Sequence, residues 1–199
     1  MFRYPHKVFE KNKIRLIAQA DSVVDIGGGK RFGKWLAEYR HLFDETKYKT
    51  LDFDSGSNPD MTGDIHHLPF VDGTVGAVIC ASVLEHVEDP KRAVEEIHRI
   101  LRPDGAAFFS VPSIYPYHAA AGHYKDYWRF FDDGLAVLFR DWHHVEIEKV
   151  GGYFKALFFF IPLQHRLQWL LAPLAYLLDA LFRTRARHTT SGYLIYGEK

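Results

Sequence analysis

The sequence predicts an α/β fold built on a doubly wound, mostly parallel sheet of seven strands with helices on both faces. Short apolar runs alternate with segments of helical periodicity along the chain, which is the pattern of a parallel sheet covered by helices. A run of three glycines follows the first apolar run. The chain has 199 residues, 47% of them hydrophobic and 25% charged, which favours one globular domain over residues 1–199.

Each expected element follows from a local pattern. A leading helix ends near residue 18, and further helices are expected at 32–39, 89–101 and 132–142. Asp89-Pro90 is a capping residue followed by a first-turn proline, and residues 102–105 are typical of a helix stop and turn. The expected strands are 22–26, 48–52, 61–64, 76–81, 106–111, 144–150 and 192–198. Ligands of such sheets bind at the carboxyl ends of the strands.

The composition argues against a nucleic-acid-binding, a disulfide-bonded or a secreted protein. Lys+Arg and Asp+Glu number 25 each, so no net positive field favours nucleic acid. The one cysteine, Cys80, lies in an apolar run and forms neither an internal disulfide nor a thiolate metal cluster. Residues 1–13 lack the apolar core of a signal peptide, which favours the cytoplasm.

The glycine-rich turn is the most informative segment. Glycines at a strand-to-helix junction let the backbone turn tightly and approach a ligand. Dinucleotide-binding enzymes also have such a turn, so a nicotinamide-dependent oxidoreductase is one alternative. If Gly27 and Gly29 are the first two glycines of that fingerprint, however, the third position is Phe32. Asp25 precedes the turn, where its charge disfavours a pyrophosphate and favours an ammonium group.

Asp52 ends the second expected strand, about twenty residues beyond the glycines. This spacing suits a carboxylate that accepts hydrogen bonds from both hydroxyls of a ribose. An exposed turn aspartate is the alternative, and the upstream glycines favour the ribose.

Five blocks of sequence together resemble the class I S-adenosylmethionine-dependent methyltransferases, specifically the broad group with the ubiquinone and menaquinone methyltransferases. The fold that this resemblance implies is Rossmann-like. The blocks are Val24-Asp25-Ile26-Gly27-Gly28-Gly29, Leu51-Asp52, Gly63-Asp64-Ile65-His66-His67-Leu68-Pro69-Phe70, Val78-Ile79-Cys80-Ala81-Ser82-Val83-Leu84-Glu85-His86-Val87 and Ile100-Leu101-Arg102-Pro103-Asp104-Gly105.

The resemblance implies S-adenosylmethionine as cofactor, and it assigns a part of the cofactor to each residue of the site. Asp25 and the glycines would face the methionine part, Asp52 and Phe53 the ribose and the adenine face, Asp64 and Ile65 the adenine, and Ala81 and Ser82 the sulfonium. The full set is Asp25, Gly27, Gly28, Gly29, Asp52, Phe53, Asp64, Ile65, Ala81 and Ser82. Lys30-Arg31-Phe32 departs from the small or polar residues usual in this group, which leaves the rim of the pocket open.

Residues 112–130, rich in aromatic and ionisable side chains, are the expected acceptor-side loop. A loop that merely packs on the sheet is the alternative. We expect methyl transfer to an oxygen or nitrogen of a small-molecule, sugar or lipid-linked acceptor, with His86 and His123 as candidate bases. Small-RNA 2′-O-methyltransferases of similar fold bind a metal through a Glu-x-x-Glu-His run and a later histidine. Ser82 replaces the first glutamate here, so Glu85, His86 and His123 are not expected to hold a metal.

Residues 153–187 form an expected apolar helical insert before the last strand. Pro173, Asp179 and the polar run 164–166 interrupt it, which argues against a membrane-spanning helix. We expect a lid over an apolar acceptor whose residues 154–187 also touch a membrane surface, with peripheral membrane association. A homodimer surface and plain core packing are the alternatives.

A third kind of function also fits the sequence. A module could keep the cofactor fold and serve only in interactions, although the intact glycines and Asp52 speak against it.

Overall fold

The computed structural model describes residues 4–161, 164–184 and 188–199. Within these residues the chain forms one seven-stranded sheet in the order β3-β2-β1-β4-β5-β7-β6. Strands β1 to β5 pair in parallel, and β7 is antiparallel to both of its neighbours. The strands are β1 Val23–Ile26, β2 Tyr48–Asp52, β3 Met61–Thr62, β4 Val75–Ala81, β5 Leu101–Pro112, β6 His144–Lys149 and β7 Gly192–Glu198. The predicted fold class is confirmed.

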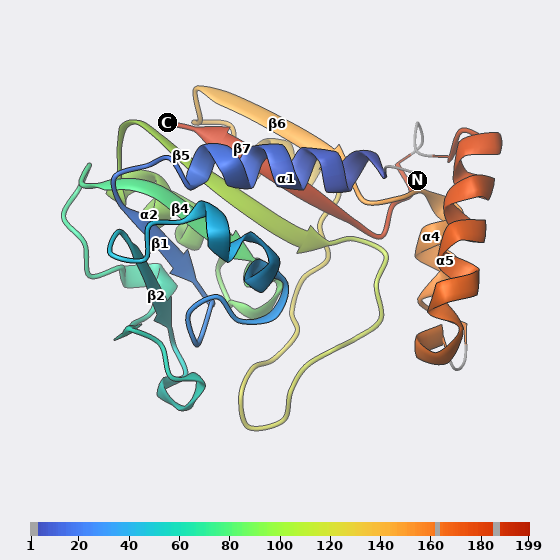
Figure 1. Cartoon of the computed structure of the whole chain (residues 1–199), viewed down its shortest axis with the longest axis horizontal. Coiled ribbons are helices and arrows are strands. Elements are labelled where there is room, and N and C mark those ends of the chain that lie inside the picture. The colour runs from blue at the N-terminus through green and yellow to red at the C-terminus, as the bar shows by residue number, and fades with distance from the viewer. Residues whose placement is uncertain (1–3, 162–163, 185–187) are drawn as a thin grey trace.

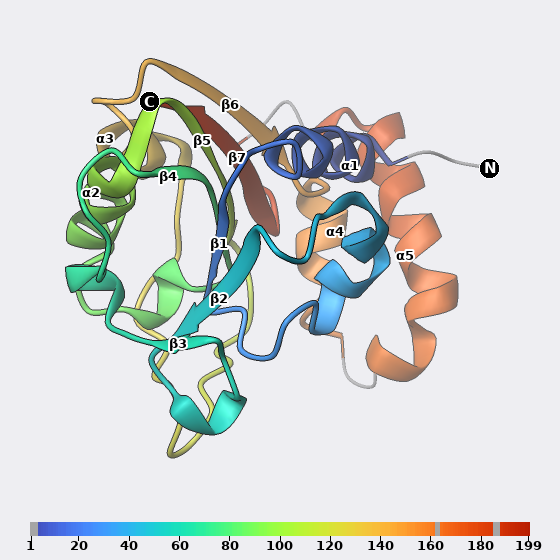
Figure 2. The same ribbon diagram turned by 60° about the vertical axis from the view of Figure 1, so that its left-hand side comes forward.

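Helices cover both faces of the sheet (Figure 2). On one face lie α1 (Pro5–Ile17) and the 3-10 helix η1 (Lys34–Leu42), and on the other lie α2 (Pro90–Ile100) and α3 (Asp132–Leu138). The helices α4 (Tyr153–Phe158) and α5 (Gln164–Leu181) stand at one end of the molecule, beside the start of α1 (Figure 1). Short 3-10 turns η2 (Ser55–Ser57), η3 (Ile65–His67) and η4 (Leu84–His86) follow β2, β3 and β4.

The core has two layers because successive strand residues point to opposite faces. Val78 and Phe109 pack on the α2 side of the sheet, whereas Ile79 and Phe108 pack on the α1 side. All four are at most 1% exposed. The unbroken apolar run of β4 is therefore explained by its central place in the sheet, buried on both faces.

The helix expected at 32–39 is displaced. Phe32 adopts a left-handed backbone conformation, φ 52°, and its buried ring stacks on Tyr48 with 4.2 Å between centroids. The chain therefore continues as a loop, and the helix begins at Lys34, has 3-10 geometry and ends at Leu42. The periodicity of the sequence did not reveal that the Phe32 side chain belongs to the core beneath the glycine turn.

Two strand boundaries also differ from the expected ones by more than one residue. The strand expected at 61–64 ends at Thr62, because Asp64 caps η3 by accepting a hydrogen bond from the His66 amide at 2.9 Å. The expected turn at 102–105 lies inside β5, which begins at Leu101 and shifts its register against β4 between Val75 and Ala77. The residues that predicted a turn lie opposite this register shift, between Leu101 and Ala106 of β5, and Asp104 among them has a φ of 66°.

The insert before β7 is helical where it is described; residues 162–163 and 185–187 of the predicted segment, with Arg185 and Arg187, lie outside the described residues. Among the described helices, none is both long and apolar enough to cross a membrane. The insert packs on the start of α1, where the Tyr176 ring lies 4.2 Å from that of Tyr4.

Asp179 joins the two helices of the insert. Its carboxylate is 1% exposed and accepts hydrogen bonds from the amides of Gly152 and Phe154 at 2.8 Å and Lys155 at 3.1 Å. The Thr184 hydroxyl donates a fourth, at 2.5 Å. These amides belong to the first turn of α4, where a helix has unpaired donors. The charge that interrupts the apolar run of α5 is thus a cap for α4.

We expect Asp179→Ala to lower the free energy of unfolding by about 2–4 kcal/mol, because several buried amides lose their acceptor. Urea denaturation measures the loss, and hydrogen exchange should show α4 deprotected first. Asp141→Ala, at a side chain that is 83% exposed, is the control with no comparable change. Equal stability of the two variants would contradict this account of the insert.

Candidate functional site

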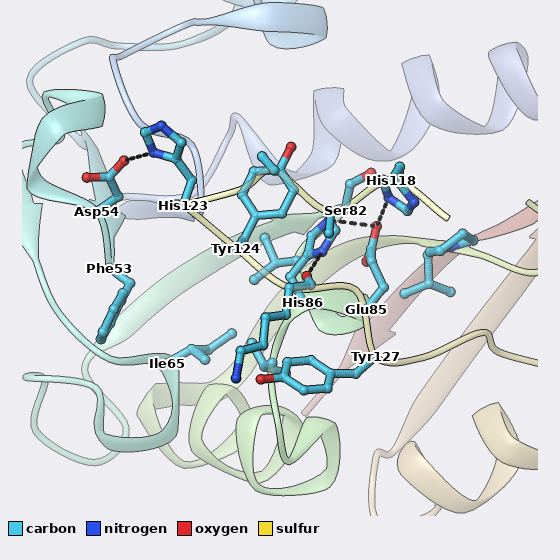
Figure 3. Close-up of a pocket in the computed structure, with 18 of the residues that line it drawn as sticks. Phe53, Asp54, Ile65, Ser82, Glu85, His86, His118, His123, Tyr124 and Tyr127 are labelled. Atoms are coloured by element: carbon cyan, nitrogen blue, oxygen red, sulfur yellow. Dashed lines mark hydrogen bonds and ion pairs between the residues drawn. The ribbon is translucent and has the colours of Figure 1, made fainter. Parts of the chain in front are cut away.

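A cavity of about 1130 Å³ opens at the carboxyl ends of β1, β2 and β4, between the turns that follow these strands and the loop that follows β5 (Figure 3). This is the location expected for a doubly wound sheet. Eight of the sequence-predicted site residues line it: Gly27, Asp52, Phe53, Asp64, Ile65, Ser82, His86 and His123. Asp25, Gly28, Gly29 and Ala81 do not line this cavity and lie behind or beside its wall.

The glycine turn presents bare backbone to the cavity. Gly27 and Gly29 have φ values of 73° and 55°, the left-handed region that glycine enters without strain. The Gly27 amide donates to the Leu51 carbonyl at 2.7 Å, which ties the turn to β2. A side chain at Gly27 would collide with Val83, which follows β4. The turn is therefore fixed between the two strands that flank β1.

Asp25 supports the turn from below. It is 7% exposed, and the Tyr48 hydroxyl donates to its Oδ2 at 2.5 Å. Burial and the charge of Asp25 raise the pKa of Tyr48, so the hydroxyl keeps its proton. Gly28 lies directly over this carboxylate, where any Cβ would overlap it. The Asp25 side chain is not part of the cavity wall, and its attraction for an ammonium group stays a prediction.

The Asp52 carboxylate is positioned by backbone donors. Oδ2 accepts from the Gly29 amide at 3.1 Å, and Oδ1 accepts from the Asp54 amide at 3.0 Å. The glycine turn thereby fixes the acid that sequence spacing assigned to a ribose. Each carboxylate oxygen has a further lone pair, and the residue lines the cavity.

The predicted adenine-side residues lie beside Asp52. Ile65 is buried and forms part of the wall, whereas the Phe53 side chain is 77% exposed at the rim. Asp64 uses its Oδ1 to accept from the His66 amide at 2.9 Å and lies 2.7 Å from the ring Nδ1. Burial alone would raise the pKa of Asp64, but the hydrogen bonds from His66 have the larger effect. The pKa therefore lies below its usual value, and the carboxylate is charged.

Ser82 directly follows the central strand β4, at a sharp turn. Its φ is 56°, and its amide donates to the Ser110 carbonyl at 2.8 Å. The chain then enters η4, which carries Glu85 and His86 into the same cavity.

Glu85, His86 and His118 form a cluster at this end of the cavity (Figure 3). Glu85 Oε1 lies 3.8 Å from His86 Nε2 and 3.7 Å from His118 Nε2. Glu85 is 1% exposed, and its buried Oε2 has no hydrogen-bond partner among the residues that the structure describes. Burial raises the pKa of Glu85 to about 7. His118 is the site residue that the sequence did not single out, because spacing alone did not distinguish it from His123 on the same loop.

His123 lies elsewhere in the cavity. Its Nδ1 is 3.0 Å from Asp54 Oδ2, on the β2 side, with the Tyr124 ring between it and the cluster (Figure 3). The structure therefore separates the two candidate bases, His86 and His123, and it replaces His123 by His118 in the set of possible metal ligands.

The loop that carries these histidines is tied to the rest of the site. Arg129 binds Asp126 at 2.6 Å, and the Tyr127 amide donates to the Glu85 carbonyl at 2.8 Å. Phe159, at the end of α4, also lines the cavity and lies 4.6 Å from the Tyr115 ring. The insert thus contributes to the wall of the cavity next to this loop.

Comparison with known proteins is consistent with this geometry. Residues 25–109 match a family model described as a methyltransferase domain. Thiol S-methyltransferase TMT1B of Homo sapiens is 30% identical over 79 residues, which is 38% of this chain and 32% of that protein. The chain spans less than half the length of the curated relatives it matches.

Solved structures share the fold over nearly the whole chain. A SAM-dependent methyltransferase from Archaeoglobus fulgidus has a TM-score of 0.62 at 12% identity, covering 98% of this chain and 93% of that one. Phosphoethanolamine N-methyltransferase 2 of Haemonchus contortus, in complex with S-adenosyl-L-methionine, has a TM-score of 0.59 at 12% identity, covering 96% and 52%. At these identities the structures show a common fold.

Residues 25–109 therefore match a methyltransferase domain, and the chain shares its fold with SAM-dependent methyltransferases, one of them solved with S-adenosyl-L-methionine bound. The narrower resemblance to ubiquinone and menaquinone methyltransferases stays a prediction. The matched residues end before the acceptor-side loop and the insert, so the acceptor is a separate question.

We expect Gly28→Ala to destabilise the protein by about 1–3 kcal/mol, because its methyl group has no room above the Asp25 carboxylate. Gly134→Ala is the matched control: it lies in α3 with nothing within 4 Å of the new methyl group, so it should be neutral or up to about 1 kcal/mol stabilising. Denaturation midpoints compare the two. Equal midpoints would show that the turn does not rest on Asp25.

Proposed function

We propose that this protein transfers a methyl group from S-adenosylmethionine to a small-molecule, sugar or lipid-linked acceptor. One observation carries the proposal: a single cavity joins the glycine turn and Asp52 to a cluster of histidines, a buried glutamate and aromatic rings. The first half has the groups that a nucleoside and an amino-acid tail require, and the second has room and chemistry for an acceptor.

The residues present fit the cofactor. Gly27 contributes only backbone to the cavity wall, because a side chain there would collide with Val83. Asp52 offers two positioned oxygens to the ribose hydroxyls. Ile65 and Phe53 supply apolar surface for the base, with the Asp64 carboxylate nearby for its amine. Ser82, at the end of β4, would border the sulfonium.

The bound cofactor supplies a sulfonium methyl that is already activated, and its carbon–sulfur bond breaks with the electron pair staying on sulfur. The protein has to align the acceptor's lone pair with that carbon and keep water away. The loop at 113–130 and Phe159 would enclose the acceptor, since both line the cavity beyond Ser82.

An acceptor that carries a proton also needs a base. His86 is the nearer candidate to Ser82 along the chain: its Nδ1 lies 2.6 Å from the Lys125 carbonyl, so that nitrogen carries the proton and Nε2 is free to accept one. His123, oriented by Asp54, is the second candidate and lies on the opposite side of the cavity.

The residues of the cavity wall support one acceptor class. Tyr115, Tyr117, Tyr124 and Phe159 surround the acceptor half, which suits a molecule with an apolar part. We propose an oxygen or nitrogen as its methylated atom. The human relative is named for a thiol acceptor, and a thiol is the second candidate because it needs no stronger base.

We also propose that the insert contacts a membrane, with the protein peripheral at its cytoplasmic face. Four exposed leucines at helical spacing form a stripe along α5, and Trp169 is 74% exposed nearby. Arg166 and Arg183 are exposed at the two ends of the helix and suit anionic lipid. The stripe consists of Leu170, Leu174, Leu177 and Leu181. A homodimer through this stripe is the alternative.

We expect Asp52→Ala to weaken binding of S-adenosylhomocysteine on the order of 100-fold, because two hydrogen bonds to a charged group are lost. Isothermal titration measures the dissociation constant. Asp72→Ala, at a side chain that is 76% exposed, is the control with unchanged affinity. Full affinity in Asp52→Ala would overturn the assigned ribose site.

The same titration separates the competing functions. Wild-type protein that binds NAD and not S-adenosylhomocysteine would favour an oxidoreductase. Protein that binds neither would favour a non-catalytic interaction module.

We expect the double variant Trp169→Ala/Leu177→Ala to lower co-sedimentation with anionic phospholipid vesicles by at least about tenfold, since two large exposed side chains leave the apolar surface. Val71→Ala, 73% exposed on a distant turn, is the control. Unchanged partitioning, with a dimer in sedimentation velocity that the double variant abolishes, would refute membrane docking and favour the dimer.

A further inference from the structure

We propose that Glu85, His86 and His118 bind a divalent transition-metal ion with an open coordination position toward the cavity. The sequence did not predict this site, because it placed His123 in the ligand set and found Ser82 where another ligand was needed. The structure replaces His123 by His118 from the same loop.

The three ligand atoms are close to coordination distance. One atom from each side chain lies within 4.8 Å of the others, and Glu85 Oε1 is 3.7–3.8 Å from both imidazole Nε2 atoms. Ligands on metal bonds of about 2.1 Å in a tetrahedral site are about 3.4 Å apart. The two Glu85–histidine distances would have to shorten by a few tenths of an ångström, and the distance between the two imidazole nitrogens, which is within 4.8 Å, by up to about 1.4 Å. Small side-chain shifts on η4 and the loop would complete the site.

Both imidazoles present the correct nitrogen. His86 Nδ1 lies 2.6 Å from the Lys125 carbonyl, and His118 Nδ1 lies 3.2 Å from both the Pro116 carbonyl and Asp126 Oδ2. The carbonyl beside His86 Nδ1 can only accept, so that nitrogen carries the proton. His118 Nδ1 has two acceptors at 3.2 Å and the Arg129 guanidinium at 3.4 Å, and we assign its proton to the two nearer acceptors. Each Nε2, 3.7–3.8 Å from Glu85 Oε1, is then the ligand atom. Metal-bound histidines in proteins have this same arrangement, with the second nitrogen held by a carbonyl or carboxylate.

Glu85 supplies the charge. Its side chain is 1% exposed, and within the described part of the chain no group forms a hydrogen bond with Oε2. A buried carboxylate without a partner is unfavourable, and a cation removes that penalty. The Tyr127 amide donates to the Glu85 carbonyl, which holds the residue in place without using its carboxylate.

The donor set also indicates the class of ion. Two imidazoles and one carboxylate suit zinc, iron(II), cobalt(II) or manganese(II) and leave positions open. All three residues line the cavity, so an open position would face the acceptor half. If the proposed methyl transfer holds, the ion would bind and orient the acceptor's nucleophilic atom. His86 would then be a ligand, which leaves His123 as the candidate base.

Titration of the purified, metal-stripped full chain with Co²⁺ tests the site. We expect stoichiometric binding with visible d–d absorption, displaced by Zn²⁺. Glu85→Gln and His118→Ala should each weaken Co²⁺ binding by well over tenfold, since even loss of a group behind a ligand costs about 10–100-fold. His123→Gln, on the same loop and in the same cavity, is the matched control that should bind Co²⁺ as wild type does.

Thermal denaturation and S-adenosylhomocysteine binding of each metal-free variant confirm that it is folded. No absorption in wild type, or equal Co²⁺ affinity in His118→Ala and His123→Gln, would overturn the metal site. Neither result touches the methyltransferase proposal as long as S-adenosylhomocysteine still binds. Co²⁺ binding as expected, without S-adenosylhomocysteine binding, would instead refute the proposed function and support the metal site.

Discussion

The contact between Gly28 and the buried Asp25 carboxylate fixes the geometry on which the cavity depends. Tyr48 from β2 donates to that carboxylate, so the support of the turn comes from the neighbouring strand. The glycine turn then positions Asp52, whose carboxylate accepts a hydrogen bond from the Gly29 amide. One buried charge thus aligns the turn after β1 with the acid at the end of β2. A side chain at Gly28 would disturb both, because there is no space between backbone and carboxylate.

The acceptor half depends on a different constraint, the meeting of two loops. The 3-10 turn after β4 carries Glu85 and His86, and the long loop after β5 carries His118. Since β4 and β5 are neighbouring parallel strands, their carboxyl ends are adjacent and their loops converge. The ion pair of Asp126 and Arg129 and the Tyr127–Glu85 hydrogen bond hold the long loop in place. The cluster is therefore positioned by secondary structure and by buried polar contacts.

The insert combines a buried polar anchor with an exposed apolar stripe. Asp179 caps α4 from within α5, which buries the polar side of the pair. The leucine stripe of α5 is left on the surface, where large apolar area is unfavourable in water and needs a partner. Phe159 extends from α4 to the cavity wall. A partner that covers the stripe would therefore be close to the acceptor half of the site.

The sequence by itself determined the sheet, its central buried strands, the glycine turn and the acid at the end of β2, because strand periodicity and glycine chemistry are local properties. It missed Phe32, whose left-handed backbone follows from a ring buried against Tyr48. The sequence analysis also treated Asp179 only as an interruption of the apolar insert. A side chain that caps a helix 25 residues away along the chain has no local sequence signature. Tertiary structure alone decided that His118 rather than His123 meets Glu85. Both histidines lie on the loop that follows β5, and only the path of that loop over η4 distinguishes them.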